Sequence, residues 1–453
     1  MEKHIYNFVV NNGVINYEND ISIMLCYNNN NTQLRNFLMK NGVNFNSFSR
    51  KRLLPINVAY ENNNIKYFNF LIKNGADINK CDENDISPIY YSCLNNNIEY
   101  LKILIENGAD INKCCDDDTS PLFIACQNNY IECLKILIKN GADVNKCRVG
   151  GYSPLYIVCG EDNIEYLKIL IENGADINKC CDDDTSPLFI ACQNNYIECL
   201  KILIKNGADV NKCRVGDFSP LYITCRENNF ECLKILIENR ADIDKCSDDG
   251  YSPLFISCQN NNIKCIKILI KNGVNINKCK YKGYSLLHLT CQNYNFECLK
   301  ILIENGANIN ICSCGNNSPL HVSCYFDNIE CINILFKSNI NIYLKNNHNK
   351  TAFYFSHEKG FKHIILKFLQ NGINIKYELQ NAPNITNCEN NYSYEKYIKE
   401  LNKYHETELK LKYEFMNIIC SNNSKSLLSR FFMINKGLRG NIGRRIISFI
   451  NAF

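Results

Sequence analysis

The sequence contains 28 cysteines among 453 residues, enough thiols for disulfides, a zinc site or redox chemistry. Most of them fall in three columns, within which cysteines are separated by 33 residues or a multiple of 33. The columns run from Cys81 to Cys312, from Cys93 to Cys324 and from Cys133 to Cys331. Adjacent pairs such as Cys114 and Cys115 do not match the spacing of zinc ligands. The regular spacing suggests that the cysteines follow a structural period.

Charged residues follow the same period, and acidic segments alternate with basic positions. The acidic positions are Asp116, Asp117, Asp118, Asp182, Asp183, Asp184, Asp248 and Asp249, and the basic ones are Arg148, Arg214, Lys280 and Lys282. Residues 97–150 are identical to residues 163–216, so part of the alternation could be a copied, solvated turn. Its continuation beyond the identical blocks favours a striped charged surface that matches a protein partner. Both interpretations stay open at this point.

A Ser-Pro pair marks the period along most of the chain. Its second position recurs every 33 residues, and proline occupies it in eight of eleven copies. The eleven positions are Ser22, Pro55, Pro88, Pro121, Pro154, Pro187, Pro220, Pro253, Leu286, Pro319 and Ala352. A fixed period of this size predicts a solenoid, because each unit can bury its apolar face only against its neighbours.

The residues of one unit predict two helices and a turn. Ser120-Pro121 suits a helix N-terminus, where the missing N–H of proline costs nothing. Residues 122–126 are apolar enough for a short helix, which Asn128-Asn129 should end. Apolar residues in 131–138 recur at helical spacing and predict a second, amphipathic helix. Gly141 then suits the left-handed residue that ends a helix, and we call the extended turn that follows a finger.

This unit resembles an ankyrin repeat. The family's Thr-Pro-Leu-His appears as Ser-Pro-Leu-Phe or Ser-Pro-Leu-Tyr, and in closer form at His288 and His321. The family's Leu-Leu-x-x-Gly-Ala-Asp-Val-Asn appears at residues 137–145. The resemblance covers about four fifths of the chain and implies an all-α solenoid of stacked helix pairs with β-turn fingers. It also implies that His288 and His321 bond backbone groups of their own repeats.

The periodic spacing also shapes our interpretation of the cysteines. Equivalent residues of packed helices lie about 8–10 Å apart, whereas a disulfide requires Cα atoms within about 7 Å. We therefore expect no pairing within a column, and we interpret the two helix columns as small apolar side chains. A metal or redox role stays open for the finger column. Many free thiols and the lack of a secretory signal predict an intracellular protein, in the cytoplasm or nucleus.

The period divides the chain into four expected segments. Residues 1–16 should form a partial N-terminal capping repeat, and residues 17–376 about eleven repeats. Residues 377–392 are polar and predict a linker, and residues 393–453 predict a small C-terminal helical region. From Arg430 onward there are five basic residues and no acidic one, but the apolar stripe favours docking on helices over binding a membrane or nucleic acid.

The end of the chain resembles the start of an F-box. The matching apolar positions are Leu438, Ile442, Ile446, Phe449 and Ile450. Poxvirus ankyrin proteins carry such a segment at this place and recruit Skp1–cullin ubiquitin ligases, so the resemblance implies an adaptor that acts in a host cytoplasm. Arg439 stands where that pattern has proline, and Asn441 where it has glutamate. A simple C-terminal helical cap would give the same spacing.

Catalytic motifs are missing from the sequence: it has no phosphate-binding loop, paired-acid site or activated nucleophile. We expect no enzymatic activity, no cofactor and no metal. The net charge of +4 is too small to indicate nucleic acid, and no apolar run approaches the ~18 residues of a membrane span. The resemblance implies a protein partner, held by the charged finger residues and by Gln127, Gln193 and Arg226. An adaptor and a passive scaffold are the alternatives.

Overall fold

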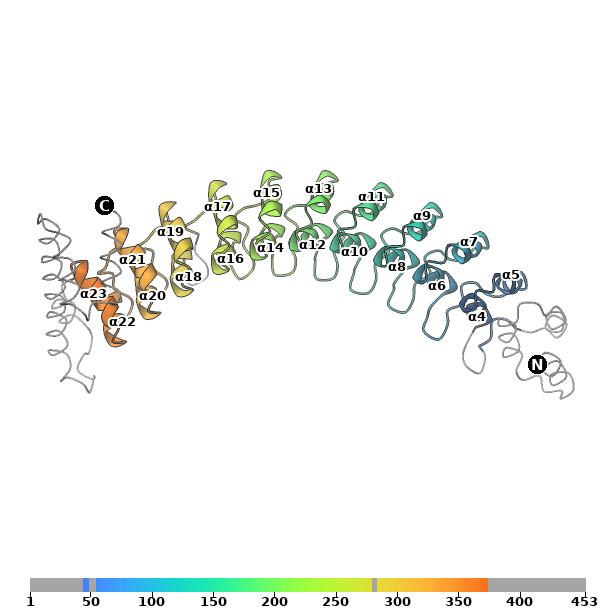
Figure 1. Ribbon diagram of the computed structural model, residues 1–453, viewed down its shortest axis with the longest axis horizontal. Coiled ribbons are helices and arrows are strands. Elements are labelled where there is room, and N and C mark those ends of the chain that lie inside the picture. The colour runs from blue at the N-terminus through green and yellow to red at the C-terminus, as the bar shows by residue number, and fades with distance from the viewer. Residues whose placement is uncertain (1–43, 49–53, 279–282, 374–453) are drawn as a thin grey trace, which may run out of the picture. The chain divides into compact units, whose positions relative to one another are not determined.

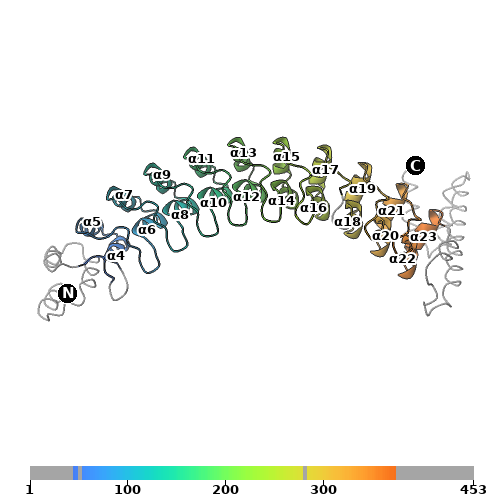
Figure 2. The ribbon, with the colours of Figure 1, turned by 180° about the vertical axis from the view of Figure 1, so that it is seen from behind.

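The computed structural model describes residues 44–48, 54–278 and 283–373, which contain twenty helices. It divides the chain into two units, Met1–Asn308 and Ile309–Phe453. Within each unit, a seven-residue first helix, a tight turn, a nine-residue second helix and a finger repeat in that order. In the first unit, the first helices lie between the second helices and the fingers (Figures 1 and 2). The predicted all-α architecture of stacked helix pairs is confirmed. The expected cap, linker and C-terminal helical region lie outside the described residues.

The first helices begin where the Ser-Pro pairs predict. Ser120 Oγ accepts a hydrogen bond from the backbone N–H of Phe123 at 3.1 Å, and Pro121 is the first helical residue. The bounds are α4 Pro55–Glu61, α6 Pro88–Leu94, α8 Pro121–Gln127, α10 Pro154–Gly160, α12 Pro187–Gln193, α14 Pro220–Arg226, α16 Pro253–Gln259, α18 Leu286–Gln292, α20 Pro319–Tyr325 and α22 Ala352–Glu358.

The second helices follow after a three-residue turn with a left-handed residue such as Asn129, at φ 59°. Gly141, at φ 89°, follows α9 in the same left-handed region, as predicted. The bounds are α5 Ile65–Lys73, α7 Ile98–Glu106, α9 Ile131–Lys139, α11 Ile164–Glu172, α13 Ile197–Lys205, α15 Phe230–Glu238, α17 Ile263–Lys271, α19 Phe296–Glu304, α21 Ile329–Lys337 and α23 Lys362–Gln370. Among the described residues, no helix combines the length and the apolar character that crossing a membrane requires.

The core lies between the helices and is lined by the predicted columns. Leu134 and Leu137 of α9 are completely buried, and so is Cys133 beside them. Cys126 of α8 is equally enclosed, and its burial raises the pKa of the thiol. The first-helix cysteines therefore act as small apolar side chains, as predicted. In the second-helix column, Cys133, Cys232 and Cys265 are also buried, but each donates a hydrogen bond to an asparagine Oδ1 at 3.4 to 3.5 Å. The finger-column cysteines that the structure describes are half-buried, and Cys114 Sγ lies 3.3 Å from the carbonyl oxygen of Asn112.

The two histidines that resemble the ankyrin pattern cap their own helices. His321 Nδ1 accepts the backbone N–H of Ser318 at 3.1 Å, so Nε2 carries the proton and donates to the Lys350 carbonyl at 3.0 Å. In the other unit, His288 Nδ1 accepts the N–H of Ser285 at 3.2 Å. Both rings are buried, which confirms the structural role predicted for them.

A column of asparagines links each repeat to the next. Asn145 Oδ1 accepts the backbone N–H of Asp176 at 2.7 Å, and its Nδ2 donates to the Gly174 carbonyl at 3.1 Å. Equivalent acceptor bonds recur in both units. Asp244 stands in this column without an amide, and it still accepts the N–H of Asn275 at 3.2 Å. The acceptor oxygen is therefore the shared element of the link.

Replacing Asn145 should show how much this link stabilises the stack. Asn145→Ala removes both bonds to the next repeat, so we expect a loss of about 1 to 2 kcal/mol in unfolding free energy. Asn145→Asp keeps the acceptor, as Asp244 does, and should lose less than half of that. Urea unfolding followed by circular dichroism measures both. Equal losses for the two variants would contradict the assignment of the link to the acceptor oxygen.

Candidate functional site

The fingers are short hairpins that hydrogen-bond to one another along the array. In finger 140–153, the backbone N–H of Val149 donates to the carbonyl of Asp117 in the preceding finger at 3.0 Å. The N–H of Asp182 in the following finger donates to the Gly150 carbonyl, also at 3.0 Å. The same two bonds recur 66 residues later. Since neighbours satisfy these backbone groups, the finger positions are fixed relative to each other.

Two of the predicted basic residues are paired with two of the predicted acidic residues. Arg148 Nε lies 3.1 Å from Asp117 Oδ2, and Arg214 Nη2 lies 2.7 Å from Asp183 Oδ2. Each pair joins adjacent fingers, and all four side chains remain about two fifths exposed, between 40% and 43%. The alternating charges at these four positions therefore neutralise one another within the protein.

The aspartate of each pair is held further by its own finger. Cys181 Sγ donates to Asp183 Oδ1 at 2.8 Å, and the backbone N–H of Thr185 donates to the same oxygen at 3.1 Å. Partial burial opposes the charged form, but these hydrogen bonds and Arg214 lower the pKa of Asp183 to about 2. Cys181 was not identified from the sequence as a hydrogen-bond donor to this carboxylate, although the repeated Cys-x-Asp-x-Thr pattern indicated it.

Asp117 has the same hydrogen bonds and ion pair as Asp183. The residues around it are also the ones whose donor atoms could coordinate a metal ion. Donor atoms of Cys115, Asp116 and Asp117 lie within 4.8 Å of one another. Cys115 Sγ already donates to Asp117 Oδ1 at 2.8 Å, however, and Asp117 is paired with Arg148. Hydrogen bonds and the ion pair lower the pKa of Asp117, although partial burial opposes this. Cys115 and Asp117 are thus bonded to each other, and Asp117 also to Arg148, so these two donors have a structural role.

The remaining acidic candidates are exposed on alternate fingers. They are Asp116, Asp118, Asp182, Asp184, Asp248 and Asp249. Asp118 and Asp184 occupy the left-handed turn of their fingers, at φ 59° in both cases. None of the six forms an ion pair with a described residue. The predicted basic residues Lys280 and Lys282 lie outside the described residues.

Apolar side chains at the fingertips were not among the predicted contacts. Val149 is 59% exposed and Val215 is 58% exposed, although both are aliphatic. Behind Val149, the exposed Tyr152 ring lies 5.2 Å from the ring of Tyr156 on α10, measured between centroids. Fixed, exposed aliphatic tips next to carboxylates form a surface with both apolar and polar character.

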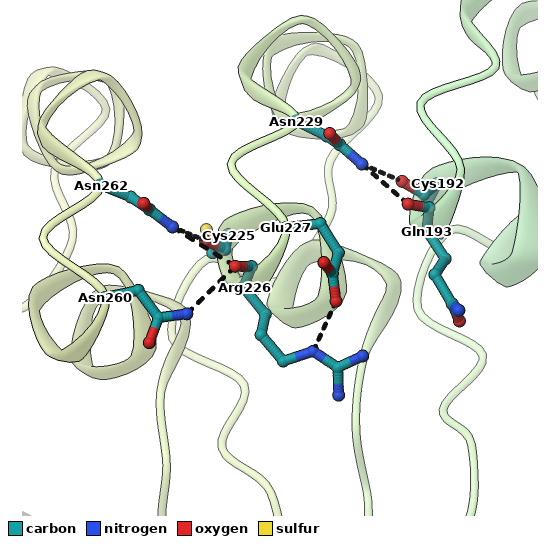
Figure 3. A network of polar contacts seen from close by, with 8 residues as sticks. All are labelled: Cys192, Gln193, Cys225, Arg226, Glu227, Asn229, Asn260 and Asn262. Atoms are coloured by element: carbon teal, nitrogen blue, oxygen red, sulfur yellow. Dashed lines mark hydrogen bonds and ion pairs between the residues drawn. The ribbon is translucent and has the colours of Figure 1, made fainter.

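The three uncharged or basic candidates lie at the ends of first helices. Gln127 and Arg226 are exposed, and Gln193 is half-buried. The backbone carbonyls of Gln193 and Arg226 link repeats, since Asn229 Nδ2 donates to the Gln193 carbonyl at 2.9 Å and Asn260 Nδ2 to that of Arg226 at 3.1 Å (Figure 3). The Arg226 side chain pairs with Glu227 at 2.8 Å. These residues are separate from the fingertips, because each lies next to the turn that leads to the second helix.

The low pKa of Asp183 predicts how its contribution to stability depends on pH. The folded value of about 2 lies below the ordinary 3.8, so the ionised carboxylate stabilises the fold above about pH 4. This contribution is lost as the pH falls from 4 to 2. Asp183→Asn should therefore lower the unfolding temperature at neutral pH, and its difference from the unchanged protein should shrink toward pH 2. The exposed neighbour supplies the control, Asp182→Asn, which should have little effect at any pH. A difference for Asp183→Asn that is constant from pH 7 to 2 would count against the prediction.

Comparison with known proteins gives the family. The family model described as "Ankyrin repeats (3 copies)" matches residues 56–148, 122–214, 211–280 and 275–346. A comparison with curated proteins found no match. Among solved structures, the chain is similar to the human ASB11 ankyrin repeat domain, with 28% identity and a TM-score of 0.41 over 45% of this chain and 92% of that one. Because the family model matches more than half of the sequence, the chain belongs to the ankyrin repeat family.

Proposed function

We propose that this protein is a non-enzymatic module that binds a partner protein at the tips of its fingers. Ankyrin repeats are generally protein–protein interaction modules. The observation that carries the proposal is the exposure of Val149 and Val215, at 59% and 58%, on fingers that their neighbours hold in place. Covering such apolar side chains stabilises a complex, by about 25 cal/mol for each Å² removed from water.

We define the finger edge as eight of the exposed residues on the fingers of the first unit. It consists of Asp116, Asp118, Val149, Asp182, Asp184, Val215, Asp248 and Asp249. Apolar centres with a polar rim are typical of protein interfaces. Because the ion pairs and backbone bonds already fix the fingers, little conformational entropy is lost on binding. We assign Gln127, Gln193 and Arg226, at the ends of the first helices, as secondary contacts.

The charge of the finger edge also selects its partner. Arg148 and Arg214 are neutralised by Asp117 and Asp183, so the alternating stripe expected from the sequence contributes less positive charge than its residues suggest. The exposed aspartates dominate this edge. Such a surface attracts a partner with basic residues, mainly by making association faster at low salt. The same negative charge repels nucleic acid.

Reversing exposed charges should weaken partner capture. Asp116→Lys together with Asp182→Lys is expected to reduce the protein captured from a cell lysate by about tenfold, a loss of roughly 1.4 kcal/mol. The control, Glu106→Lys with Glu172→Lys, makes the same charge change at exposed residues of α7 and α11. Quantitative mass spectrometry of captured proteins at two salt concentrations measures the effect. Equal capture by both variants would contradict the role of the finger edge, and would favour a passive scaffold.

A second function is supported by the end of the chain. The F-box-like pattern from Leu438 to Ile450 lies outside the described residues, and it resembles the segment by which poxvirus ankyrin proteins recruit Skp1–cullin ligases. In this function the finger edge selects a substrate, and the C-terminal segment delivers it for ubiquitination. The two functions share the same binding surface.

Deleting residues 438–453 separates the adaptor from a simple binding module. If the chain is an adaptor, the deletion should abolish co-purification of Skp1 and cullin, while partner capture at the finger edge stays unchanged. Affinity purification of the full chain, the deletion variant and residues 1–376, each followed by immunoblotting, makes the comparison. Recovery of the ligase with residues 1–376 alone would refute the adaptor function.

A further inference from the structure

The two identical sequence blocks give the protein the same surface twice. Val149 and Val215 have nearly equal exposure, 59% and 58%. In both copies a cysteine donates a hydrogen bond at 2.8 Å to the middle aspartate of its finger, Asp117 or Asp183, and an arginine of the next finger pairs with that aspartate. Both copies lie within Met1–Asn308, which is one compact unit. The duplication therefore repeats a folded surface together with the contacts that fix it.

We propose that the finger edge contains two equivalent binding stations, so that one chain holds two copies of a basic, apolar peptide segment. The inference rests on the proposed function and adds its stoichiometry and the chemistry of the partner. The first station consists of Asp116, Asp118 and Val149, and the second of Asp182, Asp184 and Val215.

The charge and the apolar tip of each station favour a basic, apolar peptide segment. At the first station, the three aspartates Asp116, Asp117 and Asp118 together with Arg148 leave two net negative charges. Asp116 and Asp118 are exposed on either side of Asp117 in the sequence, and the carbonyl of Asp117 accepts the backbone N–H of the exposed Val149 at 3.0 Å. A segment in which lysine or arginine alternates with aliphatic residues can satisfy both features at once. An acidic peptide or a nucleic acid would bring negative charge to these carboxylates.

The stations differ only beyond the identical blocks. Gly151 and Tyr152 follow the first tip, whereas Asp217 and Phe218 follow the second. Asp217 adds a carboxylate at the second station, and its partner Lys245, whose Nζ lies 3.5 Å from it, has a counterpart at the first station in Lys179. The second station is therefore more negative by one charge, and because one exposed charge contributes little, we expect the affinities of the two stations for one segment to agree within about threefold, a difference of ~0.65 kcal/mol.

The distance between the stations fits a partner with two copies of the segment. Two repeat steps of about 8–10 Å each place the stations roughly 16–20 Å apart. An extended chain covers that distance in about five or six residues, at ~3.3 Å per residue. A partner whose segments are joined by at least that many residues could occupy both stations, and linkage would raise its apparent affinity by about 10²-fold or more.

Two synthetic peptides test the inference on the full chain. One contains a single Lys-Val-Lys-Val-Lys segment, and the other contains two such segments joined by a flexible eight-residue linker of glycine and serine. A Glu-Val-Glu-Val-Glu peptide controls for apolar binding alone. The variants are Asp116→Lys with Val149→Lys for the first station, and Asp182→Lys with Val215→Lys for the second. Fluorescence anisotropy gives the affinities, and equilibrium dialysis gives the number of single-segment peptides bound per chain.

The inference predicts two single-segment peptides per unchanged chain and one per single-station variant, with little change in affinity. The two-segment peptide should bind the unchanged chain at least about tenfold tighter than either variant. The proposal of two stations would be overturned if either variant alone abolished binding of the single-segment peptide. It would also be overturned if both variants still bound two peptides per chain. Absence of peptide binding to the unchanged chain would overturn the assigned occupant. The lysate capture described above tests the proposed function independently of these outcomes.

Discussion

Packing of each repeat against its neighbours is the interaction on which the rest of this structure depends. The second helix α9 has nine residues, and a helix of this length is not stable alone in water. Its Leu134 and Leu137 are nevertheless completely buried. The polar links also run between repeats, as Asn145 illustrates with its bonds to Asp176 and Gly174. Stability is therefore a property of adjacent pairs of repeats, as expected of a solenoid.

This constraint explains how loops can form a defined surface. A finger has no core of its own, but the stack sets the spacing at which fingers meet, and their backbone groups and the Arg148–Asp117 pair then join them. Side chains at the tips, such as Val149, need not contribute to the fold, so they can vary with the partner. Duplication of two repeats copies such a surface without disturbing the stack, because each new repeat finds the neighbours it requires.

The sequence predicts the fold well because the residues that repeat determine where helices begin and end through their local conformational preferences. Ser120-Pro121 begins a helix and Gly141 follows the end of one, whatever lies elsewhere in the chain. The charge pairs are different, since they depend on which residues of adjacent fingers face each other. The sequence shows Arg148 and Asp117 as members of a stripe, whereas the register between fingers pairs them and leaves Asp116 exposed. The exposure of Val149 also depends on finger geometry, so composition alone could not identify the tip as a contact.

Amide hydrogen exchange, compared between the unchanged protein and one core variant, tests most directly whether the stability of a repeat depends on its neighbours. Leu137→Ala in α9 opens a cavity in a core shared with adjacent helices, at a cost of about 2 to 5 kcal/mol. If each repeat is stabilised by its immediate neighbours, mass spectrometry should find the largest loss of amide protection in α8 to α11, and a smaller loss with each further repeat of the first unit. A uniform loss from α4 to α19 would contradict this account, because it would mean that the repeats unfold as one cooperative body.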